Sequence, residues 1–163
     1  MASFDIVNRV DLQEVDNAIN ITRKTIHTRF DFRQSKTEDN LDKKEKKIQI
    51  VTEDDMKMKA VQETLIENLV KRKVDVRCLD AKETQMAAHG MVQKEIAIKE
   101  GIDTDNARAI VRMIKGQNLK IQAAIQEKQV RVSGKNIDDL QAVIKMLRAG
   151  QIEIPLQFVN MVR

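Results

Sequence analysis

Several polar side chains between positions 120 and 135 have the types and spacing of a surface that binds phosphates and reads bases. Lys120, Gln122, Gln126 and Arg131 alternate with apolar residues in two successive segments, and Lys135 follows the second. Because side chains alternate along a strand, the alternating polar residues should share one face of a sheet. Cations attract phosphates, and glutamine can hydrogen-bond base edges or ribose. The pattern favours nucleotide or nucleic-acid contacts, although a solvated sheet face has a similar composition.

A second candidate site is the run Arg29-Phe30-Asp31-Phe32-Arg33. Two arginines beside two phenylalanines can hold a planar, phosphorylated ligand through ionic and stacking contacts. The alternative is that the phenylalanines pack a joint between domains. We expect Arg29, Phe30 and Arg33 to complete the nucleotide site.

Catalytic and metal-binding patterns are weak in this sequence. The two histidines, His27 and His89, fall in an expected helix and an expected linker, without a nearby nucleophile or metal-ligand spacing. Gly134-Lys135 resembles the end of a phosphate-binding P-loop, but the earlier glycine is missing and Asn136 replaces the Ser or Thr. The sequence therefore predicts a binding protein rather than an enzyme, with no cofactor and no metal.

The elements that must position these residues are clearest in the second half of the chain. Segments near 93–99, 119–125 and 130–132 alternate polar and apolar residues, as half-buried strands do. Two further segments have apolar residues at helical spacing. The first begins after Asp103 and the second after Asn136, and aspartate and asparagine are both good N-cap residues. A last strand follows Pro155. The order β-α-β-β-α-β is the ferredoxin-like arrangement, in which two helices cover one face of a four-stranded antiparallel sheet.

The first half of the chain repeats this pattern. A shift of about 92 positions places Phe4 and Ile6 on Ile96 and Ile98, and a shift of about 82 places residues 48–65 on 130–147. An extra stretch near 30–40 accounts for the change of shift. The sequence thus predicts an α+β protein of two tandem ferredoxin-like, or RNP-like, domains.

The repeat sets the expected domain boundaries. The simplest division gives a first domain at 1–84, a linker at 85–89 and a second domain at 90–163. An alternative stays open, in which the N-terminal strand pairs with the sheet of the second domain, since both chain ends carry a strand that contains phenylalanine.

Charge and composition limit the class of protein. The net charge is +4, and the excess of Lys and Arg lies in the second half, which is where a polyanion would bind. The lone Cys78 indicates a reducing compartment, and we expect neither a secretion signal nor a membrane span. A cytoplasmic protein is predicted.

Several segments together resemble the YajQ family of small bacterial proteins. They are Ser3-Phe4-Asp5-Ile6-Val7, Asp11-Leu12-Gln13-Glu14-Val15, Arg29-Phe30-Asp31-Phe32-Arg33, Lys120-Ile121-Gln122, Gln129-Val130-Arg131-Val132-Ser133-Gly134-Lys135 and Asp138-Asp139-Leu140-Gln141-Ala142-Val143. The resemblance covers nearly the whole chain and implies tandem RNP-like domains without enzymatic activity. It also implies nucleotide binding, to a guanine nucleotide or to cyclic di-GMP, and a transcription regulator as partner.

Three functional hypotheses follow from the sequence. The first is a non-enzymatic nucleotide-binding protein in which Arg131, Lys135 and Lys120 contact phosphates and Gln122 and Gln126 contact ribose or base. The second is binding of tRNA or another nucleic acid by the same cations. The third is an adaptor that contacts other proteins through exposed apolar side chains.

Overall fold

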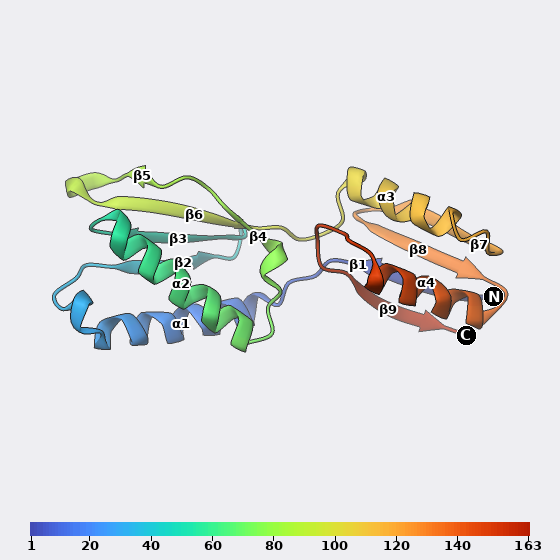
Figure 1. Ribbon diagram of the computed structural model, residues 1–163, viewed down its shortest axis with the longest axis horizontal. Helices are drawn as coiled ribbons and strands as arrows, with labels where there is room; N and C mark the ends of the chain where they lie inside the picture. The colour runs from blue at the N-terminus through green and yellow to red at the C-terminus, as the bar shows by residue number, and fades with distance from the viewer. The chain divides into compact units, whose positions relative to one another are not determined.

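The chain folds into two compact units (Figure 1). The structure is a computed structural model, and it describes residues 1–163 apart from the side chain of Phe30. We call residues 1–9 together with 100–163 the terminal unit, and residues 10–99 the inserted unit. The chain crosses from one unit to the other twice, between residues 9 and 10 and between residues 99 and 100.

The terminal unit is a complete ferredoxin-like fold built from both ends of the chain. Its elements are β1 (Ala2–Val7), α3 (Thr104–Lys115), β7 (Ile121–Gln126), β8 (Gln129–Gly134), α4 (Ile137–Ala149) and β9 (Gln157–Val162). The strands form an antiparallel sheet in the order β7-β8-β1-β9. This is the strand order of the ferredoxin-like fold, with the inserted unit placed between the first strand and the first helix.

The inserted unit has the same architecture with its strands in another chain order. Its elements are α1 (Leu12–Thr28), β2 (Glu38–Asp42), β3 (Lys47–Thr52), α2 (Asp55–Lys71), β4 (Leu79–Ala81), β5 (Gln85–Met86) and β6 (Val92–Ile98). Its sheet has the order β2-β3-β6-β4, and β5 also pairs with β6. The last strand, β6, thus occupies the position that β1 holds in the terminal unit, antiparallel to both of its neighbours.

The structure confirms the predicted α+β class and the two ferredoxin-like sheets. It has the alternative arrangement that the sequence left open, in which the N-terminal strand pairs with the sheet of the second domain, and not the simple division. The boundaries at 1–84, 85–89 and 90–163 assign β1 to the first domain and β6 to the second. Instead, β1 pairs with β8 and β9, and β6 pairs with β3 and β4. Residues 85–86, expected in a linker, form β5 and give the inserted unit a fifth strand. Each half of the chain has therefore exchanged its first strand with the other half.

Side-chain caps begin all four helices at residues that favour this role. Asp11 accepts hydrogen bonds from the backbone N–H groups of Gln13 and Glu14 at the start of α1, and Asp54 accepts one from Lys57 at the start of α2. The predicted caps Asp103 and Asn136 accept from the backbone N–H groups of Asn106 and Asp138 and begin α3 and α4. Such caps satisfy N–H groups that have no partner within the helix.

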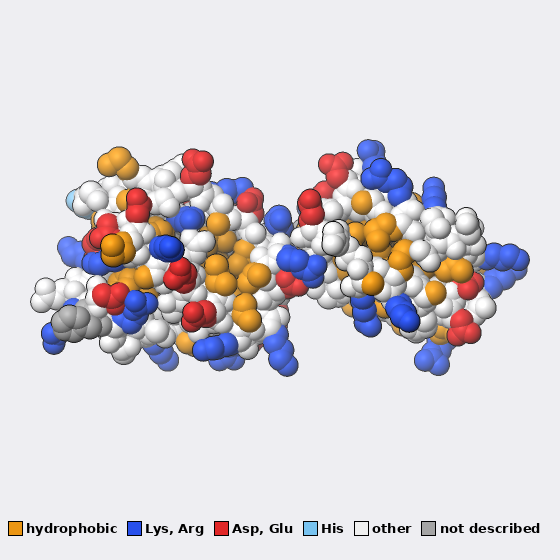
Figure 2. Space-filling view, viewed as in Figure 1, with side chains coloured by type: hydrophobic (Ala, Val, Ile, Leu, Met, Phe, Trp, Pro, Cys, Tyr) orange, Lys and Arg blue, Asp and Glu red, His pale blue; other side chains and the backbone are white. Residues whose placement is uncertain are grey.

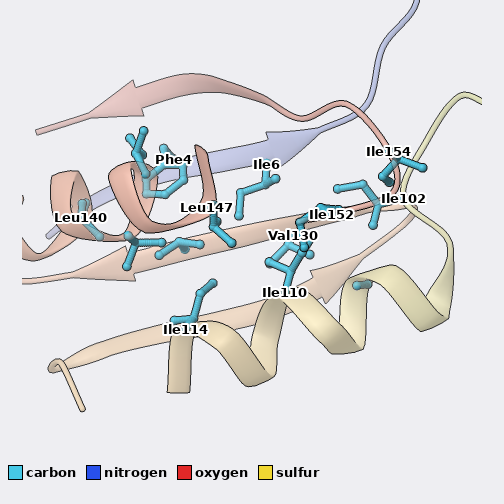
Figure 3. Close-up of a cluster of buried hydrophobic side chains, with 14 of the residues drawn as sticks. Phe4, Ile6, Ile102, Ile110, Ile114, Val130, Leu140, Leu147, Ile152 and Ile154 are labelled. Atoms are coloured by element: carbon cyan, nitrogen blue, oxygen red, sulfur yellow. The ribbon is translucent and has the colours of Figure 1, made fainter. Parts of the chain in front are cut away.

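Each sheet buries its apolar face beneath its two helices. In the terminal unit Phe4 and Ile6 of β1 belong to one buried cluster with Ile110 of α3, Val130 of β8 and Leu140 of α4 (Figure 3). The rings of Phe4 and Phe158 meet edge to face, with their centroids 6.0 Å apart. In the inserted unit the buried cluster includes Ile50, Leu65, Cys78 and Ile96. The opposite face of each sheet carries polar side chains.

The two segments that lead out of the terminal unit are tied to each other by hydrogen bonds. The backbone N–H of Gly101 donates to the carbonyl of Asn8 at 2.7 Å, and the Asn8 side chain donates to the carbonyl of Gly101 at 3.1 Å. Gly101 has a φ of +87°, a conformation that glycine adopts without strain. This contact fixes the end of β1 beside the start of the segment that leads to α3.

Candidate functional site

The β7–β8 hairpin brings five of the eight predicted site residues to one part of the terminal unit. Gln122 pairs with Ser133, and Arg131 pairs with Ala124, so Gln122, Gln126 and Arg131 share the face that the helices leave uncovered. Gln122, Gln126 and Arg131 are all exposed. The predicted grouping of these polar side chains along two strands is therefore present in the structure.

Lys120 and Lys135 lie at one end of this hairpin. The last paired residues of the hairpin are Ile121 and Gly134. Lys120 directly precedes Ile121, and Lys135 directly follows Gly134. Both lysines are exposed, and a Cβ added to Gly134 would lie 3.3 Å from the carbonyl oxygen of Lys120. Lys135 also borders an open hollow of about 480 Å³, where Asn136 and Arg163 lie beside it. This end of the hairpin therefore carries two exposed lysines, one of which lines the hollow.

Arg131 does not stand alone on the sheet face, because it pairs with Asp5. Its Nε donates to Oδ1 of Asp5 at 2.9 Å, and its Nη2 donates to Oδ2 at 3.4 Å. Asn160 of β9 donates to the same Oδ2 at 3.0 Å. Asn160 has a φ of +57° where the β1–β9 register shifts, and asparagine tolerates this conformation better than most residues. The pair neutralises charge at the centre of the sheet.

The Asp5 carboxylate is expected to make the stability of the terminal unit depend on pH in acid. The hydrogen bond from Arg131 holds the pKa of Asp5 below its ordinary value of 3.8, and Asn160 contributes to the shift. A carboxyl group with a lower pKa in the folded state than in the unfolded state stabilises the fold at any pH above the unfolded pKa. This stabilisation is lost as the pH falls through the pKa of the folded state. We therefore expect the stability of the terminal unit to fall more steeply below about pH 4 than that of an Asp5→Asn chain.

Urea denaturation from neutral pH to about pH 2, followed by the NMR signals of the terminal unit, checks this prediction. Asp138→Asn is the matched control, since Asp138 is an exposed carboxylate at the start of α4. Equal pH slopes for the parent chain and Asp5→Asn would show that the Asp5–Arg131 pair contributes nothing to the acid response.

The other three predicted site residues lie in the inserted unit. Arg29 is bound to Asp31, with N–O distances of 3.0 and 2.8 Å, and its guanidinium carbon lies 5.4 Å from the centre of the Phe32 ring. Phe32 is buried, so its ring is not available to stack on a ligand. Arg33 is exposed in the turn that follows, and the side chain of Phe30 is outside the described part of the structure.

The inserted unit also contains a polar hollow that the sequence did not suggest. It has a volume of about 610 Å³ and is lined by α1, by residues 35–37 and by the first residues of β2. Asp39 is buried beside it, paired with Arg23 at 3.2 Å, and burial raises the pKa of its carboxyl. Asp39 lies between exposed residues of β2 in a charged segment, so its burial had no signal in the sequence.

The described residues contain no cluster of three or more His, Cys, Asp or Glu side chains that could hold a metal ion. Nor does any helix among the residues that the structure describes have the length and apolar character needed to cross a membrane. His27 lies near the C-terminal end of α1 and His89 in a 3-10 turn, and both side chains are exposed.

Comparison with known proteins decides the family. The family model described as "Nucleotide-binding protein YajQ-like" matches residues 2–162. The chain belongs to the YajQ family. The chain is similar to YajQ-family relatives named nucleotide-binding protein, with 53% identity in Oleidesulfovibrio alaskensis and 50% in Nitratidesulfovibrio vulgaris, over 99% of each chain. A relative of the same name in Dehalococcoides mccartyi is 44% identical over 100% of both chains. The resemblance found in the sequence is thereby confirmed.

Proposed function

We propose that this protein binds a nucleotide on the terminal unit, along the uncovered face of the β7–β8 hairpin, without chemically changing it. The observation that carries the proposal is the arrangement of the hairpin, in which two exposed lysines lie at one end and two exposed glutamines continue along one face. The names of the relatives, which are nucleotide-binding proteins, support the same ligand class.

In this proposal the phosphates bind at the lysine end. Lys120 and Lys135 would donate charge-assisted hydrogen bonds, which are stronger than those between neutral groups. Arg131 is not assigned to a phosphate in this proposal, because its Nε and Nη2 atoms already donate hydrogen bonds to the carboxylate of Asp5. The Arg131 side chain is 51% exposed, and its planar guanidinium can stack on a base.

The glutamine side chains would supply the polar contacts to the sugar or the base. Gln122 lies two positions, or about 7 Å, from Lys120, and Gln126 lies four positions, or about 13 Å, beyond Gln122 on the same face. An amide offers both a donor and an acceptor, as the edges of bases require. The spacing suits a ligand that lies along the strand, with phosphate at one end.

The finer parts of the proposal concern ligand and setting. Cyclic di-GMP and guanine nucleotides are the candidate ligands, and a transcription regulator is the candidate downstream partner. We place the protein in the cytoplasm, because its single cysteine, Cys78, takes part in no disulfide. Arg29 and Arg33 are not needed for the hairpin site.

Calorimetric titration with GTP, GMP and cyclic di-GMP tests the proposal. We expect heat with at least one of them, and a loss of affinity of about tenfold or more in a Lys120→Ala, Lys135→Ala chain, since two charge-assisted contacts are removed. A matched control is Lys59→Ala with Lys145→Ala, two exposed lysines on α2 and α4. Equal losses of nucleotide affinity in the two double variants would show that the hairpin is not the binding site.

Salt dependence separates a small ligand from a nucleic acid. Binding of tRNA through several phosphates should weaken by more than about tenfold between about 50 and 200 mM salt. A mononucleotide held by two lysines should respond much less. No heat with any nucleotide, together with salt-sensitive binding of tRNA, would replace the proposed function with nucleic-acid binding.

A further inference from the structure

The outer edge of the terminal sheet, at β7, lacks the features that usually protect an exposed strand. β7 has the sequence Ile-Gln-Ala-Ala-Ile-Gln, with no charged residue and no proline, and its register with β8 is unbroken. The two other long edge strands differ, since β2 carries Glu38, Asp39 and Asp42 and the β9 ladder is bulged. Native proteins use charges, proline and bulges to keep edge strands from pairing with other chains. β7 is therefore available for pairing.

The surface beside this edge is both apolar and cationic. Arg108, Arg112 and Lys115 are exposed on α3 and line an open hollow of about 520 Å³ together with Val111 and Ile125. Ile125 of β7 is 48% exposed. Figure 2 shows several Lys and Arg side chains along the outer side of α3, with acidic side chains near the start of the helix. Asp105 is the acidic residue that lines the hollow.

These cations are also available for contact. None of the ion pairs found within the described part of the chain involves one of the three basic residues of α3. By contrast, Arg131 on the open face of the same sheet is paired with Asp5 at 2.9 Å. The hollow therefore combines unpaired positive charge, exposed apolar surface and unpaired strand backbone.

We propose that β7 is a docking site for an extended acidic segment of a partner protein, which adds a strand to the sheet. The backbone of the segment would pair with the free edge of β7, one apolar side chain would cover Ile125 and Val111, and acidic side chains would meet Arg108, Arg112 and Lys115. Strand addition combines main-chain affinity with side-chain specificity in this way.

Other occupants fit the surface less well. A nucleic acid would satisfy the cations, but it offers neither a peptide backbone for β7 nor an aliphatic side chain for Ile125. A second copy paired through β7 would bring two sets of α3 cations toward the same edge, and like charges oppose such a contact. The acidic segment is the one occupant that satisfies all three features, and it does not depend on the nucleotide proposal.

A labelled peptide of about eight residues that alternates glutamate with valine is a suitable probe, because it spans a strand of this length. We expect it to bind in fluorescence anisotropy, to shift the NMR signals of β7 and to slow amide exchange at Ala123 and Ile125, whose backbone N–H groups point away from β8. A lysine–valine peptide of equal length should not bind. A nucleotide-free sample is used, so that the result does not depend on the hairpin site.

Charge reversal on α3 provides the matched comparison. Lys115→Glu should weaken peptide binding about threefold to tenfold, whereas Lys145→Glu on α4 makes the same change of net charge and should leave the affinity unaltered. Equal effects of the two variants, unshifted β7 signals, or dimerisation of the protein through β7 would each overturn the proposal. So would an oligonucleotide that displaces the peptide and shifts β7 more strongly.

Discussion

A chain that begins at Val10 is expected to keep the inserted unit folded and to lose the terminal unit. Residues 1–9 contain β1, which lies between β8 and β9 at the centre of the terminal sheet. Without β1, two strand ladders lose their partner and Phe4 and Ile6 leave the core. Burial of such side chains is worth about 1.5 to 3 kcal/mol each, against a total stability of about 5 to 15 kcal/mol for a small domain.

Proton–nitrogen NMR spectra can follow the two units separately. In the shortened chain, signals from residues 10–99 should stay where they are in the full chain, whereas signals from residues 100–163 should collapse to the narrow range of an unfolded peptide. A synthetic peptide of residues 1–9 should restore the terminal unit in a concentration-dependent manner. Dispersed β7 and β8 signals in the shortened chain without the peptide would refute the observed strand assignment.

The fold was predictable at the level of elements because the signals for elements are local. The alternation of Ile96 and Ile98, the helical spacing of Ile110 and Ile114, and the caps Asp103 and Asn136 all depend on neighbours in the chain. The duplication then indicated two copies of one topology. The four predicted α-helices are present and the strands form two antiparallel sheets as predicted, although one strand of each sheet comes from the other half of the chain.

The exchange of first strands was not predictable from pattern alone. Phe4 and Ile6 alternate with their neighbours in the same way as Ile96 and Ile98. Either strand could therefore supply the apolar side chains that the buried face of either sheet needs. The choice between them depends on the segments that connect β1 to α1 and β6 to α3, and the contact between Asn8 and Gly101 has no sequence signature. The sequence therefore allowed both arrangements.

The same exchange explains what the sequence missed in the candidate site. Asp5 lies opposite Arg131 because β1 pairs with β8, so a sequence interpretation that kept β1 in the first domain left Arg131 with full positive charge. Lys120, Gln122, Gln126 and Lys135 depend only on a local hairpin, and their grouping was predictable. The roles of these side chains in binding stay predictions.

Equivalent core substitutions in β1 and β6 should destabilise opposite units. Phe4 and Ile96 are equivalent in the repeat, each is 1% exposed, and each belongs to a different core. Phe4→Ala should cost the terminal unit about 3 to 5 kcal/mol, and Ile96→Ala should cost the inserted unit about 2 to 5 kcal/mol. With the simple tandem boundaries, the effects would fall on the opposite halves of the chain.

The buried thiol of Cys78 provides a reporter for this comparison, because it is the single cysteine and lies in the core of the inserted unit. Ile96→Ala should raise its rate of labelling by a thiol reagent about thirtyfold or more, since 2 kcal/mol corresponds to that change in the unfolded population. Phe4→Ala should leave this rate near that of the parent chain while hydrogen exchange in β8 and α4 accelerates. A faster reaction of Cys78 in Phe4→Ala than in Ile96→Ala would mean that β1 stabilises the inserted unit, and the exchanged arrangement would then be wrong.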